Sequence, residues 1–391
     1  MCKRILVSQT NTEDGVPFYK IGTIGSTPDA YISKELFDDY KVKYNYPRKG
    51  EVMITCAGTV GKCVVYDGED AYFQDSNIVW IDNPTQYISN GFLFHLLSKV
   101  DWRKLNSTTI IRIYNDDLRN LKMSYPRKEE QQKISHLLSL LDERIATQNK
   151  IIEDLKKLKS AIIEKTFNEN YSNKIRLRDV GSYIRGLTYS SDDVVESNGI
   201  FVMRSNNIIN GSSLDYHNNI VSVNKQILTE QQLQTGDIVI CMANGSSSLV
   251  GKSSFYDGDC STPITVGAFC GIYRSKEPIV KWLFQTNKYR RYIWNSLQGG
   301  NGAIANLNGD DILRMSFSIP ATPAKDNRIK LLTSVDTLLE SNISLCDLYI
   351  SQKLYLLRQM FINNIDGAST ASVLINRTHR VLRFRFSSQY F

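Results

Sequence analysis

Two long stretches of the chain place apolar residues at alternating steps of three and four. In the first stretch, residues 129–167, these positions are Ile134, Leu138, Leu141, Ile145, Ile152, Leu155 and Ile162. In the second, residues 326–362, they are Leu332, Val335, Leu339, Cys346, Tyr349, Leu356 and Met360. This spacing forms the seam of a coiled coil, so each stretch is predicted to fold as one long helix.

Polar residues interrupt both seams at the same two steps. They are Gln148 and Lys159 in the first helix and Asn342 and Lys353 in the second. About 38 residues at 1.5 Å each give a rod of roughly 55 to 60 Å. Exposure of either apolar seam to water is unfavourable, so the two helices are predicted to pack on each other. They would run antiparallel if a pseudo-twofold axis relates them. In the alternative arrangement, each helix packs on its own domain.

The helices belong to a larger repeat along the chain. Residues 116–167 match residues 310–361 at a constant offset of 194, and Val60-Gly61-Lys62 returns as Val250-Gly251-Lys252 at an offset of 190. Offsets that drift in small steps are typical of two copies of one unit whose loops differ in length. Because this period is too long for a solenoid, the chain is predicted to contain two similar globular domains, each followed by a helix.

Each globular unit has the pattern of an α+β domain. Short apolar runs at residues 52–55 and 237–242 predict strands. The Asp-Gly pairs in Tyr66-Asp67-Gly68 and Tyr256-Asp257-Gly258 predict hairpin turns. One short helical stretch is expected in each unit, at residues 91–105 and 280–297. Elements of these types predict α+β packing in both units.

Composition narrows the class of protein. A chain of 391 residues with 42% hydrophobic residues is expected to form two to three domains with cores of their own. It has no apolar run that approaches the roughly 18 to 20 residues of a membrane span. The seven cysteines form no Cys-x-x-Cys pair beside only four histidines, which favours reduced thiols in a cytoplasmic protein. The net charge of +7 is a mild indication of a polyanionic partner.

The motifs that could indicate catalysis are incomplete. Residues 248–253 end like a phosphate-binding loop, but the upstream glycine falls one residue early, at Gly245. The Gly-x-Gly-x-x-Ala run at residues 300–305 follows a predicted helix, whereas dinucleotide binding needs a preceding strand. The histidines have no spacing that suggests a shared metal or a catalytic triad. The chain is therefore predicted to hold no catalytic residues, no metal and no cofactor, and to act by binding.

A specific resemblance lies at the start of the first long helix. Residues 125–134 read Tyr-Pro-Arg-Lys-Glu-Glu-Gln-Gln-Lys-Ile and residues 140–145 read Leu-Leu-Asp-Glu-Arg-Ile. This run closely resembles the segment that opens the conserved helix of type I restriction-modification specificity subunits. Residues 50–62 and 236–252 look like the core strand and loop of that family's target-recognition domain. The second helix departs from the pattern, because residues 324–329 read Ala-Lys-Asp-Asn-Arg-Ile.

The resemblance implies an α+β fold of two similar target-recognition domains joined by two long antiparallel coiled-coil helices. The expected parts are domain 1 (1–126), helix 1 (127–170), domain 2 (171–320), helix 2 (321–366) and a tail (367–391). Near its end the tail reads Arg383-Phe384-Arg385-Phe386, which is similar to the leader of such a domain. It reflects a rearranged gene, lends structure to domain 1, or is an unstructured basic tail.

The family also implies a mechanism without an active site. Such subunits select a sequence in double-stranded DNA and carry two methyltransferase subunits, with motor-nuclease subunits added for cleavage and no membrane partner. Each domain would read a few base pairs in the major groove, where all four pairs are distinguishable. The rod would set an unread spacer, and the two half-sites would differ because the domains differ.

Loop residues are the expected DNA contacts, since variable loops on a fixed scaffold carry specificity. Asparagine and arginine suit bases, and lysine suits phosphates. The candidates in domain 1 are Lys62, Arg103, Lys104, Thr108, Thr109 and Arg112. Those in domain 2 are Arg204, Asn206, Asn207, Asn244, Ser246, Lys252, Arg290, Arg291 and Asn301.

Two rival functions remain compatible with the sequence. One is a coiled-coil scaffold that binds proteins instead of DNA, which an absence of salt-sensitive DNA binding by the assembled complex would favour. The other is a self-sufficient modifying enzyme, which methyl transfer by the purified chain alone would favour.

Overall fold

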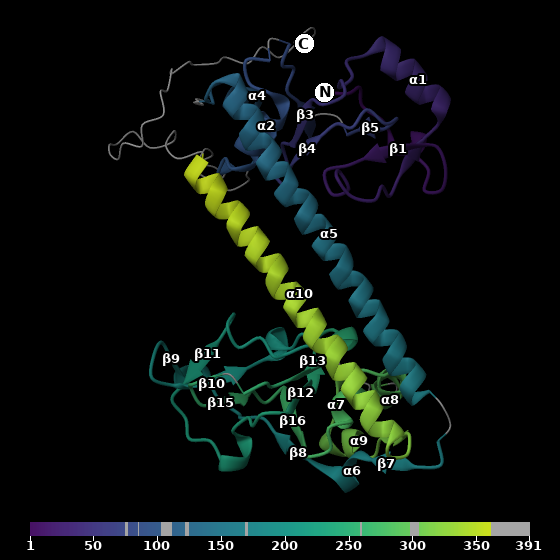
Figure 1. Ribbon diagram of the computed structural model, residues 1–391, viewed down its shortest axis with the longest axis vertical. Coiled ribbons are helices and arrows are strands. Elements are labelled where there is room, and N and C mark those ends of the chain that lie inside the picture. The colour runs from purple at the N-terminus through teal and green to yellow at the C-terminus, as the bar shows by residue number, and fades with distance from the viewer. Residues whose placement is uncertain are drawn as a thin grey trace. The chain divides into compact units, whose positions relative to one another are not determined.

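The computed structural model describes the chain except residues 75–76, 85, 103–111, 122–124, 169–170, 259, 298–304 and 361–391. The chain divides into two compact units (Figure 1). Unit 1 comprises Met1–Gln148 with the segment from Leu345 onward, and unit 2 comprises Asn149–Ser344. Each of the two long helices therefore contributes one half to each unit.

Unit 1 is built on two three-stranded sheets. In one, β1 (Val16–Tyr19) lies between antiparallel β2 (Tyr31–Ile32) and parallel β5 (Tyr72–Phe73). In the other, β3 (Val52–Thr55) lies between antiparallel β4 (Cys63–Val65) and β6 (Ile78–Trp80). The helical segments are η1 (Val7–Gln9), α1 (Lys34–Lys43), α2 (Asn90–Ser98) and α4 (Asn115–Arg119).

The central strand β3 is buried along its whole length and divides the core of unit 1. Its alternate residues belong to two apolar clusters. Ile54 packs with α2 through residues such as Leu93, and Met53 packs with α1 and β5 through residues such as Phe37 and Tyr72. A strand buried on both faces explains why its sequence, Val-Met-Ile-Thr, shows no polar alternation.

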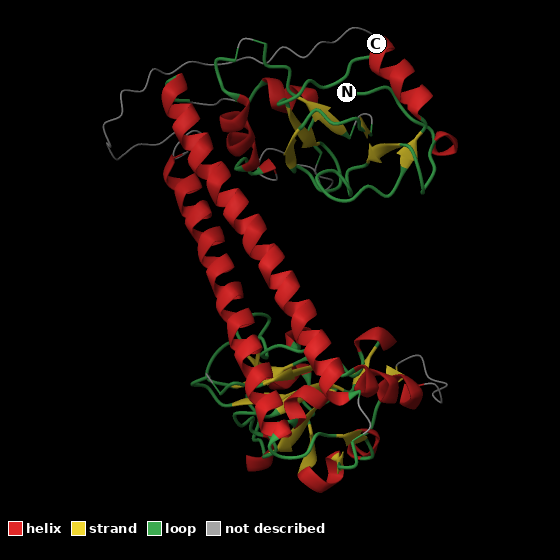
Figure 2. Ribbon diagram, turned by 45° about the vertical axis from the view of Figure 1, so that its right-hand side comes forward, coloured by secondary structure: helices red, strands yellow, loops and turns green. Residues whose placement is uncertain are grey.

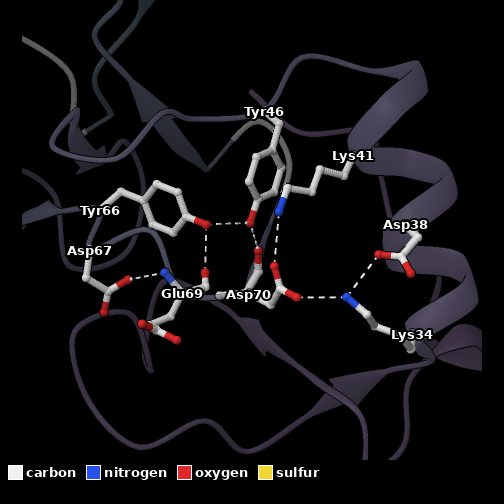
Figure 3. Close-up of polar contacts among 9 residues, drawn as sticks. Lys34, Asp38, Lys41, Tyr46, Tyr66, Asp67, Glu69 and Asp70 are labelled. Carbon is white, nitrogen blue, oxygen red and sulfur yellow. Dashed lines mark hydrogen bonds and ion pairs between the residues drawn. The ribbon is translucent and has the colours of Figure 1, made fainter.

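A polar cluster lies beside helix α1 (Figure 3). The Asp70 carboxylate accepts from Lys34 at 2.7 Å and from Lys41 at 3.0 Å. The Tyr46 hydroxyl meets that of Tyr66 at 3.0 Å. Because both lysines and Asp70 are at least 40% exposed, water screens these bridges and they contribute little to stability. The ring of Phe37 on α1 is fully buried, and this burial favours docking of the helix.

Unit 2 repeats both sheets and extends them. One sheet has the order β14-β12-β16-β8 and the other β15-β10-β11-β9. The strands of the first are β8 (Gly181–Arg185), β12 (Ile238–Cys241), β14 (Ser253–Phe255) and β16 (Cys270–Ser275). Those of the second are β9 (Val194–Val195), β10 (Ile200–Met203), β11 (Val221–Val223) and β15 (Ile264–Val266).

Two small two-stranded sheets and several short helices complete unit 2. The strand pairs are β7 (Lys174–Arg176) with β18 (Ser316–Ser318) and β13 (Ala243–Asn244) with β17 (Ala305–Asn306). The helices are α6 (Leu177–Val180), α7 (Val280–Leu283), α8 (Asn287–Leu297) and α9 (Gly309–Leu313). The short 3-10 turns are η2 (Ser191–Asp193), η3 (Ser205–Asn207), η4 (Thr229–Gln231) and η5 (Ser247–Leu249).

The repeat seen in the sequence corresponds to a repeat in the folds. In unit 1, β1 has β2 antiparallel on one side and β5 parallel on the other. In unit 2, β10 has β11 and β15 in the same senses. The strand triplets β4-β3-β6 and β14-β12-β16 are likewise both antiparallel. Mixed helix and sheet in both units agrees with the predicted α+β class.

The predicted Asp-Gly hairpins are wrong. The turn at Gly68 joins β4 to β5, and the turn at Gly258 joins β14 to β15, but in each case the two strands lie in different sheets. Both glycines have positive φ, 95° and 84°, which an Asp-Gly turn favours. A local turn is therefore present at both predicted positions. The pairing of the flanking strands depends instead on contacts with strands that are distant in sequence.

The prediction of one helix at residues 280–297 is also wrong in one respect, because this stretch forms two helices. It breaks between α7 and α8, where the Thr286 hydroxyl accepts a hydrogen bond from Tyr289 N at 3.1 Å. A threonine that caps a helix start in this way favours a new helix over continuation of the old one.

The two long helices are α5 (Lys128–Phe167) and α10 (Ala324–Met360), close to the predicted spans. Within each unit their halves lie side by side (Figure 1; Figure 2). In unit 1, Asp142 of α5 pairs with Lys353 of α10. In unit 2, Lys159 of α5 pairs with Asp336 of α10. The helices also pack on their domains, since Ile163 and Leu332 belong to the core of unit 2.

Candidate functional site

Three loops of unit 2 converge on one surface. They are residues 204–207 after β10, residues 242–248 after β12, which include the short strand β13, and residues 267–269 between β15 and β16. Hydrogen bonds join them: Gly267 N to Met203 O at 2.8 Å, Met242 N to Phe269 O at 2.8 Å, and Asn244 Nδ2 to Ser205 Oγ at 3.3 Å. We call this the three-loop surface of unit 2.

Several predicted DNA contacts lie on this surface. Arg204, Asn206 and Ser246 are exposed and Asn244 is half-buried. The Arg204 guanidinium donates to Asn219 O at 3.2 Å, and Asn244 Oδ1 accepts from Ser246 N at 3.0 Å. The structure therefore brings together two groups of candidates that are about 40 residues apart in the sequence.

Asn207 is a correction to the predicted contacts. Its side chain is fully buried, and its amide donates to the Asp215 and Asn218 carbonyls at 3.1 and 2.8 Å while its oxygen accepts from Arg204 N. A buried amide with its hydrogen bonds satisfied shapes the loop instead of reading DNA.

The remaining described candidates of unit 2 lie beside a glycine turn. Gly251 has φ +80°, and a Cβ there would lie 2.7 Å from Ile293 of α8. The Tyr289 hydroxyl, also on α8, donates to Gly251 O at 2.7 Å. This close approach sets half-buried Lys252 next to α8, whose exposed side carries Arg290 and Arg291.

Unit 1 has an equivalent arrangement of loops. Gln74 N donates to Tyr19 O at 2.9 Å and Cys56 N donates to Asn77 O at 2.7 Å. Here the Lys62 ammonium donates to Ile24 O at 2.5 Å, so it fastens one loop of its own unit. Its predicted phosphate contact remains a prediction.

Arg112 follows the same pattern as its counterpart in the repeat. Ile113 N donates to Cys56 O at 2.9 Å, as Leu307 N donates to Met242 O at 2.8 Å. Arg112 and Asn306 thus precede equivalent backbone contacts, at the edge of the loops. The candidates Arg103, Lys104, Thr108, Thr109 and Asn301 lie outside the described residues.

Charged side chains are buried where the long helices meet the domain of unit 2. In unit 2, Lys159 and Asp336 are each 7% exposed and 2.6 Å apart, and Lys281 approaches the same carboxylate at 2.7 Å. Burial lowers the pKa of Lys159, against the opposing effect of Asp336. The Lys159 ammonium also lies 5.5 Å from the centre of the Trp282 ring.

In unit 1, the corresponding pair lies beside a buried histidine. Burial lowers the pKa of His95 to about 4, and Lys353 acts in the same direction. Asp142 and a hydrogen bond with the Ser135 backbone oppose the shift. The histidine is therefore neutral at pH 7.

The sequence contains a signal for these pairs outside the seam itself. Lys159 and Lys353 interrupt the apolar seam, whereas their partners Asp142 and Asp336 each follow a seam residue by one position. All four recur at the offset of 194. An acid that repeats beside the seam and a base that repeats within it are candidates for pairing between the two helices.

The described residues do not suggest a reactive centre. No three side chains of His, Cys, Asp or Glu in this part of the chain gather as metal ligands would. Burial raises the pKa of the Cys270 thiol to about 12 and that of Cys56 to about 11, which disfavours the nucleophilic thiolate. No helix among these residues is long and apolar enough to cross a membrane.

Comparison with known proteins gives a consistent family. A family model described as "Type I restriction modification DNA specificity domain" matches residues 1–157. A Haemophilus influenzae protein named "Putative type I restriction enzyme specificity subunit S.HindORF215P" is 50% identical over 155 residues, 40% of each chain. The EcoKI type I restriction enzyme specificity subunit of Escherichia coli is 34% identical over 173 residues, 41% of this chain and 34% of that one.

A solved structure resembles the chain over a greater length. The type I restriction-modification S subunit of M. genitalium covers 93% of each chain with a TM-score of 0.56 and 15% identity. At this identity the likeness concerns the fold alone. The chain spans less than half the length of the curated relatives that it matches.

Proposed function

We propose, on the premise that this chain belongs to the family of type I restriction-modification specificity subunits, that it selects the DNA sequence for a type I complex. Each unit reads one half of a split, asymmetric site in double-stranded DNA. The chain itself performs no chemistry, which its partner subunits supply.

The observation that carries this proposal is the presence of equivalent loop surfaces in both units with different residues on them. Met242 N to Phe269 O in unit 2 corresponds to Cys56 N to Asn77 O in unit 1. A framework repeated in both units with different side chains suits reading of different base pairs, because each pair presents its own pattern in the major groove. Arg290, Arg291 and Lys252 beside the surface of unit 2 suit contacts with phosphates.

The spacer between the half-sites is set, in this proposal, by α5 and α10 as one antiparallel rod. The ion pairs Asp142–Lys353 and Lys159–Asp336 support it. Asp336 follows Asp142 by 194 residues, and Lys353 follows Lys159 by 194. The second pair is therefore the first with the two helices exchanged, as a pseudo-twofold axis across antiparallel helices requires.

A second apolar face on these helices suits partner subunits. Exposed apolar residues recur at intervals of seven or fourteen, one or two coiled-coil heptads: Leu137, Ile151 and Leu158 on α5, and Leu331, Leu338 and Leu345 on α10. Leu137 and Leu331 are equivalent in the repeat, as are Ile151 and Leu345. We assign these two faces to two methyltransferase subunits, with motor-nuclease subunits joining the assembly for cleavage.

A ruler experiment tests this proposal. Four residues inserted after Gln148 and four after Asn342 lengthen a paired rod by about 6 Å and rotate it by roughly 40°. Adenine methylation, mapped in cells that also express the methyltransferase subunit, should then show the same two half-sites moved apart by about two base pairs, at roughly 3.4 Å per pair. The lengthened seam costs some stability.

Insertion after Gln148 alone is the mismatched control. It shifts one seam against the other and should abolish methylation. If the doubly lengthened chain methylates sites with the original spacer, the rod does not set the spacing. If the unaltered chain directs no sequence-specific methylation, the proposed function itself fails.

A further inference from the structure

Phe269 is an exposed aromatic ring on a rigid turn. Its side chain is 66% exposed. Its carbonyl accepts from both Met242 N at 2.8 Å and Ala243 N at 3.1 Å, and Cys270 N closes the turn onto Gly267 O at 2.8 Å. The backbone is therefore fixed while most of the ring remains in water, where a partner group could cover it and gain the free energy of apolar burial.

The loops that carry the ring also carry short polar side chains. Asn244 and Ser205 join the neighbouring loops by their side chains, and Ser246 and Asn206 are exposed on the same loops. A protein partner would usually meet a broader apolar patch than one ring. An apolar group among amide and hydroxyl groups matches the edge of an A·T pair in the major groove, which presents hydrogen-bonding groups and one methyl group.

The equivalent position of unit 1 is different. Asn77, whose carbonyl accepts from Cys56 N as that of Phe269 accepts from Met242 N, is half-buried and polar. The same turn thus presents an aromatic ring in one unit and an amide in the other. The two units therefore differ on the loop surfaces that are proposed to read two different half-sites.

We propose that the Phe269 ring packs on the methyl group of a thymine in the half-site read by unit 2, and that it is a specificity-determining residue. This inference rests on the proposed function. Phe269 touches no other subunit in this assignment, and it selects thymine over cytosine and over uracil by the contact of its ring with the methyl group.

Uracil substitution provides the test, because uracil lacks only the methyl group of thymine. The complete complex is assembled with its methyltransferase subunits. Its affinity is then measured for the DNA site that it recognises, with each thymine of that site replaced in turn by uracil. Loss of one buried methyl group corresponds to about a fourfold loss of affinity. The expected result is one such position in the half-site of unit 2. The Phe269→Ala complex should lose affinity for the thymine site by a similar factor. Replacing that thymine by uracil should then cause no further loss of affinity.

Phe269→Leu and Trp294→Ala serve as controls. Leucine retains an apolar contact and should keep part of the uracil sensitivity. Trp294 is 62% exposed on α8, outside the three loops, so its loss should leave the cost of each methyl deletion unchanged. Because the Phe269 ring is mostly exposed, thermal unfolding of Phe269→Ala should match that of the unaltered chain.

Two results would overturn the assignment. One is an unaltered complex that tolerates uracil at every position of the site, and the other is a Phe269→Ala complex with undiminished uracil sensitivity. Failure of the unaltered complex to prefer any DNA sequence is a different outcome, because it contradicts the proposed function and not only the role of the ring.

Discussion

The junctions between the long helices and the two domains contain the same ion pair in different surroundings. In unit 2, Lys159 and Asp336 are each 7% exposed, with Lys281 and the Trp282 ring against them. In unit 1, the side chains of Lys353 and Asp142 are 22% and 38% exposed. A repeat in the sequence has therefore produced one geometry and two electrostatic environments.

The difference shows how burial changes what one contact does. An exposed pair gains little, because water screens the charges and ordering the side chains costs entropy. A buried pair is different, since removal of one partner leaves the other charge without solvent or a counter-ion. The same substitution at the two equivalent positions should therefore have unequal effects on stability.

The largest expected effect comes from Asp336→Ala. It leaves two ammonium groups, Lys159 and Lys281, without their shared carboxylate, which should cost about 3 to 5 kcal/mol of unfolding free energy. Asp142→Ala at the equivalent position should cost at most about 1 kcal/mol. Denaturant unfolding of the full chain, followed by hydrogen exchange to locate the loosened unit, measures both. Equal losses from the two variants would contradict the comparison.

A smaller effect is expected from pH at His95. Its pKa of about 4 in the folded unit lies below the value of about 6.5 of an unfolded chain. The folded state therefore binds fewer protons, so stability is fully present above about pH 6.5 and is lost as the pH falls toward 4. Between pH 7.5 and 5 the loss should be about 2 kcal/mol.

His95→Phe should remove this pH dependence. Phenylalanine keeps an apolar ring at the position but has no proton to bind. Stability curves of both chains at pH 7.5, 6 and 5 give the comparison, and the difference between them should grow only as the pH falls. A parallel course of the two curves would show that His95 is not the titrating group.

The smallest effect concerns the two repeated lysines. Lys252→Ala should reduce the slope of log affinity against log salt by roughly one unit, as loss of one phosphate contact does. Lys62→Ala should change the slope less, because its ammonium is bonded to Ile24 O. Binding titrations of the assembled complex across salt concentrations provide the slopes. An equal decrease in both would restore a phosphate contact for Lys62.

Local patterns determined the elements and the repeat of this protein. The 4-3 spacing of apolar residues located α5 and α10, since a seam is written in neighbouring turns of one helix. The offset of 194 residues indicated two similar units. Short apolar runs indicated the strands, because β3 and β12 are buried on both faces.

Tertiary structure alone decided which groups are buried and which strands pair. Asn207 and Asn206 are adjacent in the sequence, yet only Asn206 is exposed. The Asp-Gly turns join different sheets, and Lys159 meets Asp336 across 177 residues. Burial and pairing of this kind depend on surfaces contributed by distant segments, whose packing no local periodicity encodes.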